Sequence, residues 1–205
     1  MEFEHHTLQR NGLRWHVVVA GPQDAYPVLL LHCWTGNWSL WQTTMERLAG
    51  KFRFIAPDHL GFGQSDKPRG DHYQIVQQAE RAKFILESFG YARAHVVGHS
   101  MGGQIALTLA AQYPDMVTRL VVVDPAVQGN RLHPLTYLGA PYMAMARHGI
   151  EFPYRWTYQI ASRFPSLGIQ LMRVYFPHPS KQRESALYWA GQVAADGQLN
   201  SSAWA

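Results

Sequence analysis

A serine between two glycines is the feature of this sequence best suited to covalent chemistry. The stretch 98–102 reads Gly-His-Ser-Met-Gly; an apolar run, 94–97, precedes it, and an apolar helical pattern follows it. A sharp turn crowds the backbone on both sides of its apex, where only glycine leaves room. The pattern predicts a strand, a turn and a helix, with the hydroxyl of Ser100 raised at the apex as a nucleophile.

The flanking elements decide between two roles for Ser100. The bare Gly-x-Ser-x-Gly pattern is weak evidence, because it arises by chance in roughly one chain in fifteen of this length. The alternative is a helix-capping serine in a nucleotide-binding turn. The strand before the turn and the helix after it favour the nucleophile. The first helical N–H groups, including that of Met101, would then face the attacked group and stabilise the negative charge formed there.

Strands and helices that could position this turn alternate along the chain. Apolar runs typical of strands predict strands at 3–8, 13–19, 28–31, 52–55, 94–97 and 120–123. Helices are expected at 40–49, at 73–89 and directly after Ser100. Asn11-Gly12 predicts a hairpin turn between the first two strands. This alternation predicts an α/β fold with a mostly parallel sheet and helices on both of its faces.

Three ordered motifs resemble those of the α/β-hydrolase family. The stretch 29–36, Leu-Leu-Leu-His-Cys-Trp-Thr-Gly, is similar to the family's strand and oxyanion loop, and 97–103 is similar to its nucleophile elbow. The stretch 55–68, Ile-Ala-Pro-Asp-His-Leu-Gly-Phe-Gly-Gln-Ser-Asp-Lys-Pro, resembles the segment after its fourth strand. The resemblance covers nearly the whole chain up to Asp124 and continues loosely beyond it. It implies the family's fold and, less specifically, a hydrolase.

The resemblance also implies the groups around the nucleophile. The second oxyanion donor, beside Met101, would be the N–H of Trp34. The family has a His-Gly pair before this position, whereas this chain has His32-Cys33, which puts a Cβ where the backbone usually approaches closely. Cys33 is expected to be a small apolar filler, with a reactive thiol as the alternative. His32 and His99 are expected to hydrogen-bond around the reacting groups without touching the substrate.

The acid and base of a catalytic triad are harder to place. In the resembled family the triad runs serine, acid, histidine along the chain. Asp124, at the end of the strand after the elbow helix, is the candidate acid; a strand-ending turn at Asp124-Pro125 is the alternative. The histidines after Ser100 lie in a segment without predicted strands: His133, His148 and His178. We therefore expect the catalytic histidine to be absent from this chain.

The segment after the last predicted strand is aromatic-rich and interrupted by prolines. We expect a core domain at 1–128 and a helical lid at 129–205, with a helical layer that has no gating role as the alternative. The family's last strands are expected to be missing, which would leave the 120–123 strand as an apolar sheet edge. The chain is thus expected to be a truncated or split product, or a fragment completed by a second chain.

Composition limits the classes of function. The chain has 205 residues, of which 47% are hydrophobic and 16% charged, which suits a globular domain with a sizeable core. Its net charge of +4 is scattered, so no nucleic-acid partner is expected. A single cysteine excludes an internal disulfide. Neither a signal peptide nor a membrane span is expected. No metal site or cofactor is expected either, and Gly61-Phe-Gly63 is not a phosphate loop because it lacks the third glycine and the following helix. A cytoplasmic protein is expected.

These features favour a serine hydrolase acting on an ester or a related acyl or carbon–carbon bond. A lid rich in aromatic residues suggests a small hydrophobic or aromatic acyl substrate. Ser100 in place of an aspartate argues against haloalkane dehalogenases and epoxide hydrolases, whose covalent intermediate uses a carboxylate. The alternatives are a cofactor-independent dioxygenase with the same fold, some of which place the acid where Asp124 stands, and a non-catalytic protein that keeps the scaffold.

Overall fold

The structure, a computed structural model, describes residues 1–34, 36–68 and 70–125. The chain divides into two compact units, Met1–Leu132 and His133–Ala205, and the first is described below. The predicted lid at 129–205 lies outside the described residues, as do the three histidines that follow Ser100.

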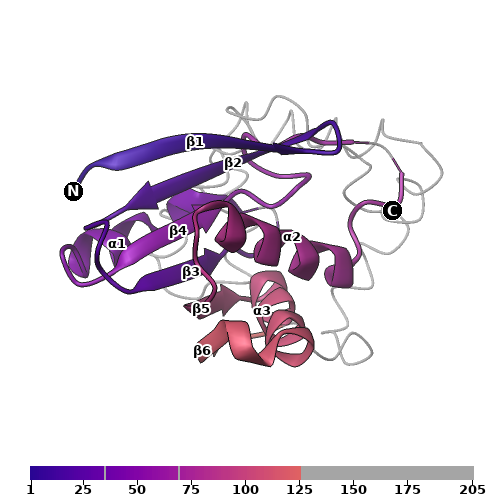
Figure 1. The fold of residues 1–205 in the computed structure, drawn as a ribbon. Coiled ribbons are helices and arrows are strands. Elements are labelled where there is room, and N and C mark those ends of the chain that lie inside the picture. Colours follow the sequence, from indigo (N-terminus) through magenta and orange to yellow (C-terminus); the bar gives the residue numbers. More distant parts are fainter. Residues whose placement is uncertain (35, 69, 126–205) are drawn as a thin grey trace, which may run out of the picture. The chain divides into compact units, whose positions relative to one another are not determined.

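A six-stranded mixed sheet forms the centre of the described unit (Figure 1). Its strands are β1 (Phe3–Arg10), β2 (Leu13–Ala20), β3 (Pro27–Leu31), β4 (Arg53–Pro57), β5 (Ala94–His99) and β6 (Val117–Val123). They lie in the order β1-β2-β4-β3-β5-β6. The strands β4, β3, β5 and β6 run parallel, whereas β1 pairs with β2 and β2 with β4 in antiparallel fashion. The predicted α/β fold with a mostly parallel sheet is confirmed.

Helices cover both faces of this sheet (Figure 1). The helical segments are η1 (Trp38–Trp41), α1 (Gln42–Arg47), α2 (Ile75–Ser88), α3 (Met101–Gln112) and η2 (Pro114–Met116). Side chains of β3 alternate between two cores: Leu29 and Leu31 pack with α2 and α3, while Val28 and Leu30 pack with Met45 of α1. A strand buried on both faces reads as a continuous apolar run, which is why 28–31 was recognisable. None of the described helices is long and apolar enough to cross a membrane.

The turn between β1 and β2 has the predicted hairpin geometry. Asn11 and Gly12 have φ values of 52° and 76°, the positive values that a type I′ turn requires at both central positions. The register that this turn sets pairs His5 with Val18 and Thr7 with His16. The hairpin therefore brings His16 to a fixed place beside the loop that follows β4, where it contacts Asp58.

The last strand is longer than its apolar pattern suggested. β6 begins at Val117 rather than at 120, because its pairing with β5 already starts where Ala94 faces Val117. Within the described residues β6 lies at the edge of the sheet, and Val121 and Val123 are 53% and 47% exposed. The predicted apolar edge is present in this part of the chain.

Candidate active site

Ser100 occupies the strained apex of the turn between β5 and α3. Its φ of 52° and ψ of −114° lie in a region that costs a non-glycine residue about 1–3 kcal/mol. Backbone hydrogen bonds hold the apex: Ser100 N–H donates to the carbonyl of Val123 at 2.9 Å, and Gln104 N–H donates to the carbonyl of Ser100 at 3.1 Å. The Ser100 side chain makes no capping hydrogen bond to α3. The capping alternative is therefore wrong, and Ser100 as a whole is partly buried.

The two glycines around Ser100 permit direct backbone contact. A Cβ on Gly98 would lie 2.2 Å from the carbonyl oxygen of Gly102. A Cβ on Gly102 would lie 2.2 Å from the carbonyl oxygen of Leu31 and 2.5 Å from that of His32. The first turn of α3 thus packs against the end of β3 and the start of the loop that follows it. This contact brings together the two segments predicted to carry the oxyanion donors.

The predicted donors come from these two segments. Met101 is the first residue of α3, and N–H groups of a first helical turn have no partner within their own helix. Trp34 lies in the loop after β3, three residues beyond Leu31, and is partly buried. Burial raises the pKa of the Cys33 thiol in the same loop, which keeps it protonated and fits the expected role of an apolar filler. The two-amide oxyanion site remains a prediction.

The two histidines predicted to lie near the nucleophile differ in their surroundings. His32 is fully buried; its Nδ1 lies 2.7 Å from the carbonyl oxygen of Cys33, and its Nε2 accepts a hydrogen bond from the N–H of His59 at 2.9 Å. Burial, with a further contribution from His59, lowers the pKa of His32 to about 3. The Nδ1 of His99 is buried and has no hydrogen-bond partner in the described part of the chain. The predicted hydrogen bonding of His99 stays a prediction.

Asp124 follows β6 directly beside the elbow. It is exposed and has a φ of 46°, and the residue before it, Val123, accepts the hydrogen bond from Ser100 N–H. A positive φ at a strand end is a turn conformation, so the structure contains the turn that was the alternative for this position. No histidine within the described ranges is hydrogen-bonded to Ser100 or Asp124. The role of Asp124 as an acid remains a proposal.

A buried carboxylate that the sequence did not single out, Asp58, contacts the neighbouring loops. Asp58 is 1% exposed; its Oδ1 accepts from Trp38 N–H, and its Oδ2 accepts from Gln64 N–H, both at 2.8 Å. His16 Nδ1 lies 2.8 Å from the same Oδ2. Ser65 Oγ donates to the carbonyl of Asp58 and accepts from His16 N–H. One carboxylate thus joins β2, η1 and the loop after β4. No described cluster of three or more His, Cys, Asp or Glu residues could hold a metal.

The glycine at 63 lies directly against this carboxylate. A Cβ on Gly63 would lie 2.1 Å from Asp58 Oδ2, and Gly63 has a φ of 50°. The loop can therefore wrap around the carboxylate only with glycine here. The prediction of a strand-to-loop turn, rather than a phosphate loop, is confirmed. An aspartate three residues before a Gly-x-Gly pair was the signal that could have revealed this arrangement.

Asp58→Asn is expected to lower the free energy of unfolding by about 3–5 kcal/mol, because the amide nitrogen cannot accept the hydrogen bonds that converge on the carboxylate. Asp66→Asn provides the control: Asp66 bonds the exposed Arg14, and its replacement is expected to cost about 1 kcal/mol. Urea unfolding of both variants measures the difference. Equal losses would show that the Asp58 network does not hold these loops.

Comparison with known proteins identifies relatives of the described unit. A family model described as the alpha/beta hydrolase fold matches residues 26–165. The soluble epoxide hydrolase of Corynebacterium sp. (strain C12) is 37% identical over 123 residues, which cover 60% of this chain and 42% of that protein. The matched stretch therefore spans less than half of this relative.

Two solved structures illustrate the similarity of fold. The epoxide hydrolase CorEH without ligand superposes with a TM-score of 0.75 at 26% identity, over 98% of this chain and 72% of that one. The N-acyl homoserine lactonase AidH complexed with N-butanoyl homoserine superposes with a TM-score of 0.55 at 26% identity, over 60% of this chain and 45% of that one.

Proposed function

Because this chain belongs to the alpha/beta hydrolase fold family, we propose that it carries the nucleophile and the oxyanion donors of a serine hydrolase. The observation that carries the proposal is the conformation of Ser100, a non-glycine residue held at φ 52° and ψ −114° with a side chain that caps nothing. Strain at one residue that the surrounding structure maintains is typical of functional sites. A serine that served only the fold would have been replaced here by glycine at no cost in strain.

In the proposed reaction Ser100 Oγ attacks the acyl carbon of the substrate and gives its proton to a histidine base. The negative charge on the attacked oxygen is stabilised by the N–H groups of Met101 and Trp34, and one such donor contributes about 3 kcal/mol to lowering the barrier. The leaving group takes the proton, and water then hydrolyses the acyl-serine. No described residue supplies the base, so the reaction needs a histidine from elsewhere in the whole protein; Asp124 is the proposed acid.

The names of the epoxide hydrolases above suggest a second candidate, the opening of an epoxide. A carboxylate that opens an epoxide forms an ester, whose carbonyl carbon water can attack to release the product. A serine hydroxyl would form an alkyl ether, which has no carbonyl carbon for water to attack. Because Ser100 stands at the apex, acyl transfer is the better proposal.

The proposed substrate is a small hydrophobic or aromatic ester, or a related compound with an acyl or activated carbon–carbon bond. The similarity to a structure named as an N-acyl homoserine lactonase supports an acyl substrate, because opening a lactone is also an acyl transfer. The likeness extends to 60% of this chain. Lactones should accordingly be included among the test substrates.

Ester hydrolysis and epoxide opening can be separated in one set of assays. We expect aryl esters to release their phenol slowly, since without a histidine base the hydroxyl of Ser100 is only a weak nucleophile, and styrene oxide to give no diol. Ser100→Ala should remove the enzymatic part of the ester reaction. The matched variant Ser100→Asp supplies a carboxylate at the same apex. Diol formation by the unaltered chain, with ester release unaffected by Ser100→Ala, would overturn the proposal.

The remaining alternatives have their own readouts. A cofactor-independent dioxygenase consumes oxygen when it is given a quinolone-like substrate, and its activity would not depend on ester chemistry. A non-catalytic protein would show neither oxygen uptake nor any effect of Ser100→Ala. Oxygen-electrode and ester assays on the same sample therefore separate the three functions.

A further inference from the structure

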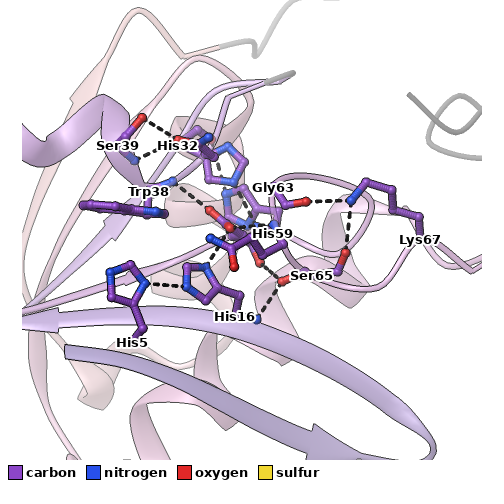
Figure 2. A network of polar contacts seen from close by, with 12 residues as sticks. His5, His16, His32, Trp38, Ser39, His59, Gly63, Ser65 and Lys67 are labelled. Carbon is purple, nitrogen blue, oxygen red and sulfur yellow. Dashed lines mark hydrogen bonds and ion pairs between the residues drawn. The ribbon is translucent and has the colours of Figure 1, made fainter. Parts of the chain in front are cut away.

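Two buried imidazoles lie against the backbone of the loop that follows β3 (Figure 2). The ring centroids of His32 and His59 are 4.2 Å apart, and the side chains are 0% and 4% exposed. Three hydrogen bonds connect the rings and the backbone. His59 N–H donates to His32 Nε2 at 2.9 Å, His32 Nδ1 lies 2.7 Å from the carbonyl oxygen of Cys33, and His59 Nε2 lies 3.2 Å from the carbonyl oxygen of His32.

These partners determine where each ring carries its proton. A backbone N–H can only donate, so His32 Nε2 must be the acceptor and the proton of His32 must sit on Nδ1, where it is donated to Cys33. A carbonyl oxygen can only accept, so His59 must carry its proton on Nε2. His32 is therefore neutral, because its Nε2 carries no proton, and the protons that make these contacts sit on opposite nitrogens of the two rings. Burial disfavours a positive charge on either ring, which agrees with this assignment.

The carbonyl oxygen that His59 binds is also part of the contact with the nucleophile turn. A Cβ on Gly102 would lie 2.5 Å from the His32 carbonyl oxygen, so Gly102 packs directly on the group that His59 holds. On the far side of the loop, Gly36 N–H donates to the carbonyl of Cys33 at 3.0 Å. The two imidazoles and the Gly36 amide together hold the carbonyl groups at 32 and 33, and hence the direction of the chain into Trp34.

We propose that His59 is a positioning residue for the oxyanion loop and that it acts through His32, with the two imidazoles in opposite neutral tautomers. The proposal rests on the proposed function, because the loop that His59 would hold in place is the one from which the N–H of Trp34 would donate to the oxyanion. His59 touches no reacting atom. It holds the His32 carbonyl, and through the Gly102 contact it sets the spacing between this loop and Ser100.

The first test uses the full 205-residue chain at pH 7, with ¹⁵N-labelled histidine. Long-range ¹H–¹⁵N spectra are expected to place the proton of His32 on Nδ1 and that of His59 on Nε2. This readout needs no variant, no substrate and no active Ser100. A proton on His59 Nδ1, or a charged ring at either position, would overturn the proposal.

The second test compares His59→Gln with His59→Asn. Both carry the same amide donor, but only glutamine reaches the position of Nε2. We expect His59→Gln to stay within about threefold of the unaltered chain in hydrogen exchange of the Gly36 amide and in the rate of Ser100 labelling by a fluorophosphonate. His59→Asn should raise the exchange rate and lower the labelling rate, each by about ten- to a hundredfold.

These outcomes separate the two proposals. If the tautomers and the Gly36 exchange follow expectation but Ser100 is never labelled, the serine hydrolase fails and the loop assignment stands. If Ser100 is labelled but the two variants do not differ, the positioning role of His59 fails and the hydrolase stands. If His59→Asn does not fold, the tautomers of the unaltered chain decide the question.

Discussion

Gly102→Ala is expected to lower the free energy of unfolding by about 3–5 kcal/mol and to abolish reaction at Ser100. The added Cβ would lie 2.2 Å from the carbonyl oxygen of Leu31, a backbone atom in a central strand that cannot move aside. Relief of the clash must separate α3 from β3 and thus Met101 from the loop that holds Trp34. Urea unfolding and the rate of fluorophosphonate labelling measure the two effects.

Gly103→Ala is the control for this variant. It lies one position along the same helix, where a Cβ would meet the Cβ of Pro125 at 3.0 Å, its nearest neighbour. The gain of about 1 kcal/mol in helix propensity from alanine offsets a small shift, so we expect stability within about 1 kcal/mol of the unaltered chain. Equal losses in the two variants would show that helix packing in general, and not the contact with β3, limits this site.

Acidification is expected to unfold the described unit between about pH 6 and pH 4. His32 and His59 have folded-state pKa values of about 3 and about 4, because burial disfavours their charged forms. In the unfolded chain a histidine titrates near 6.5, so below that pH the unfolded state binds more protons than the folded state. The part of the free energy of unfolding that depends on these two histidines is fully present above pH 6.5. Below that pH, the free energy falls by about 2.7 kcal/mol for each unit by which the pH is lowered. Urea unfolding at several pH values measures this slope.

Replacement of a single histidine tests which groups cause the free energy of unfolding to fall with pH. His59→Gln removes one of the two groups and should halve the slope while keeping the donor. A full slope in His59→Gln would assign the acid sensitivity to other groups.

The fold and the nucleophile turn were predictable because their patterns are local. A continuous apolar run marked β3, and two glycines around Ser100 marked a sharp turn. In the structure a Cβ at either glycine would clash with backbone atoms. Boundaries were less predictable where pairing decides them. β6 starts at Val117 because β5 offers a partner there, which the apolar pattern of β6 alone does not reveal.

The buried polar contacts could not be predicted in the same way, since they join segments distant in sequence. Asp58 and His16 are 42 residues apart, and His32 and His59 are 27 apart. The Gly-x-Gly pair after Asp58 is a local signal for a turn, but it does not reveal which distant side chains the carboxylate contacts. Only the sheet order, which places β4 between β2 and β3, brings them into contact.

Identification of the residue that forms a covalent adduct is the most direct test of the account. The chain is incubated with an excess of a fluorophosphonate for long enough to allow the slow reaction expected without a histidine base, then digested, and the modified peptide is identified by mass. We expect one adduct, on Ser100, and none in Ser100→Ala. An unmodified Ser100, or an adduct that persists in Ser100→Ala, would contradict the claim that this serine is the nucleophile.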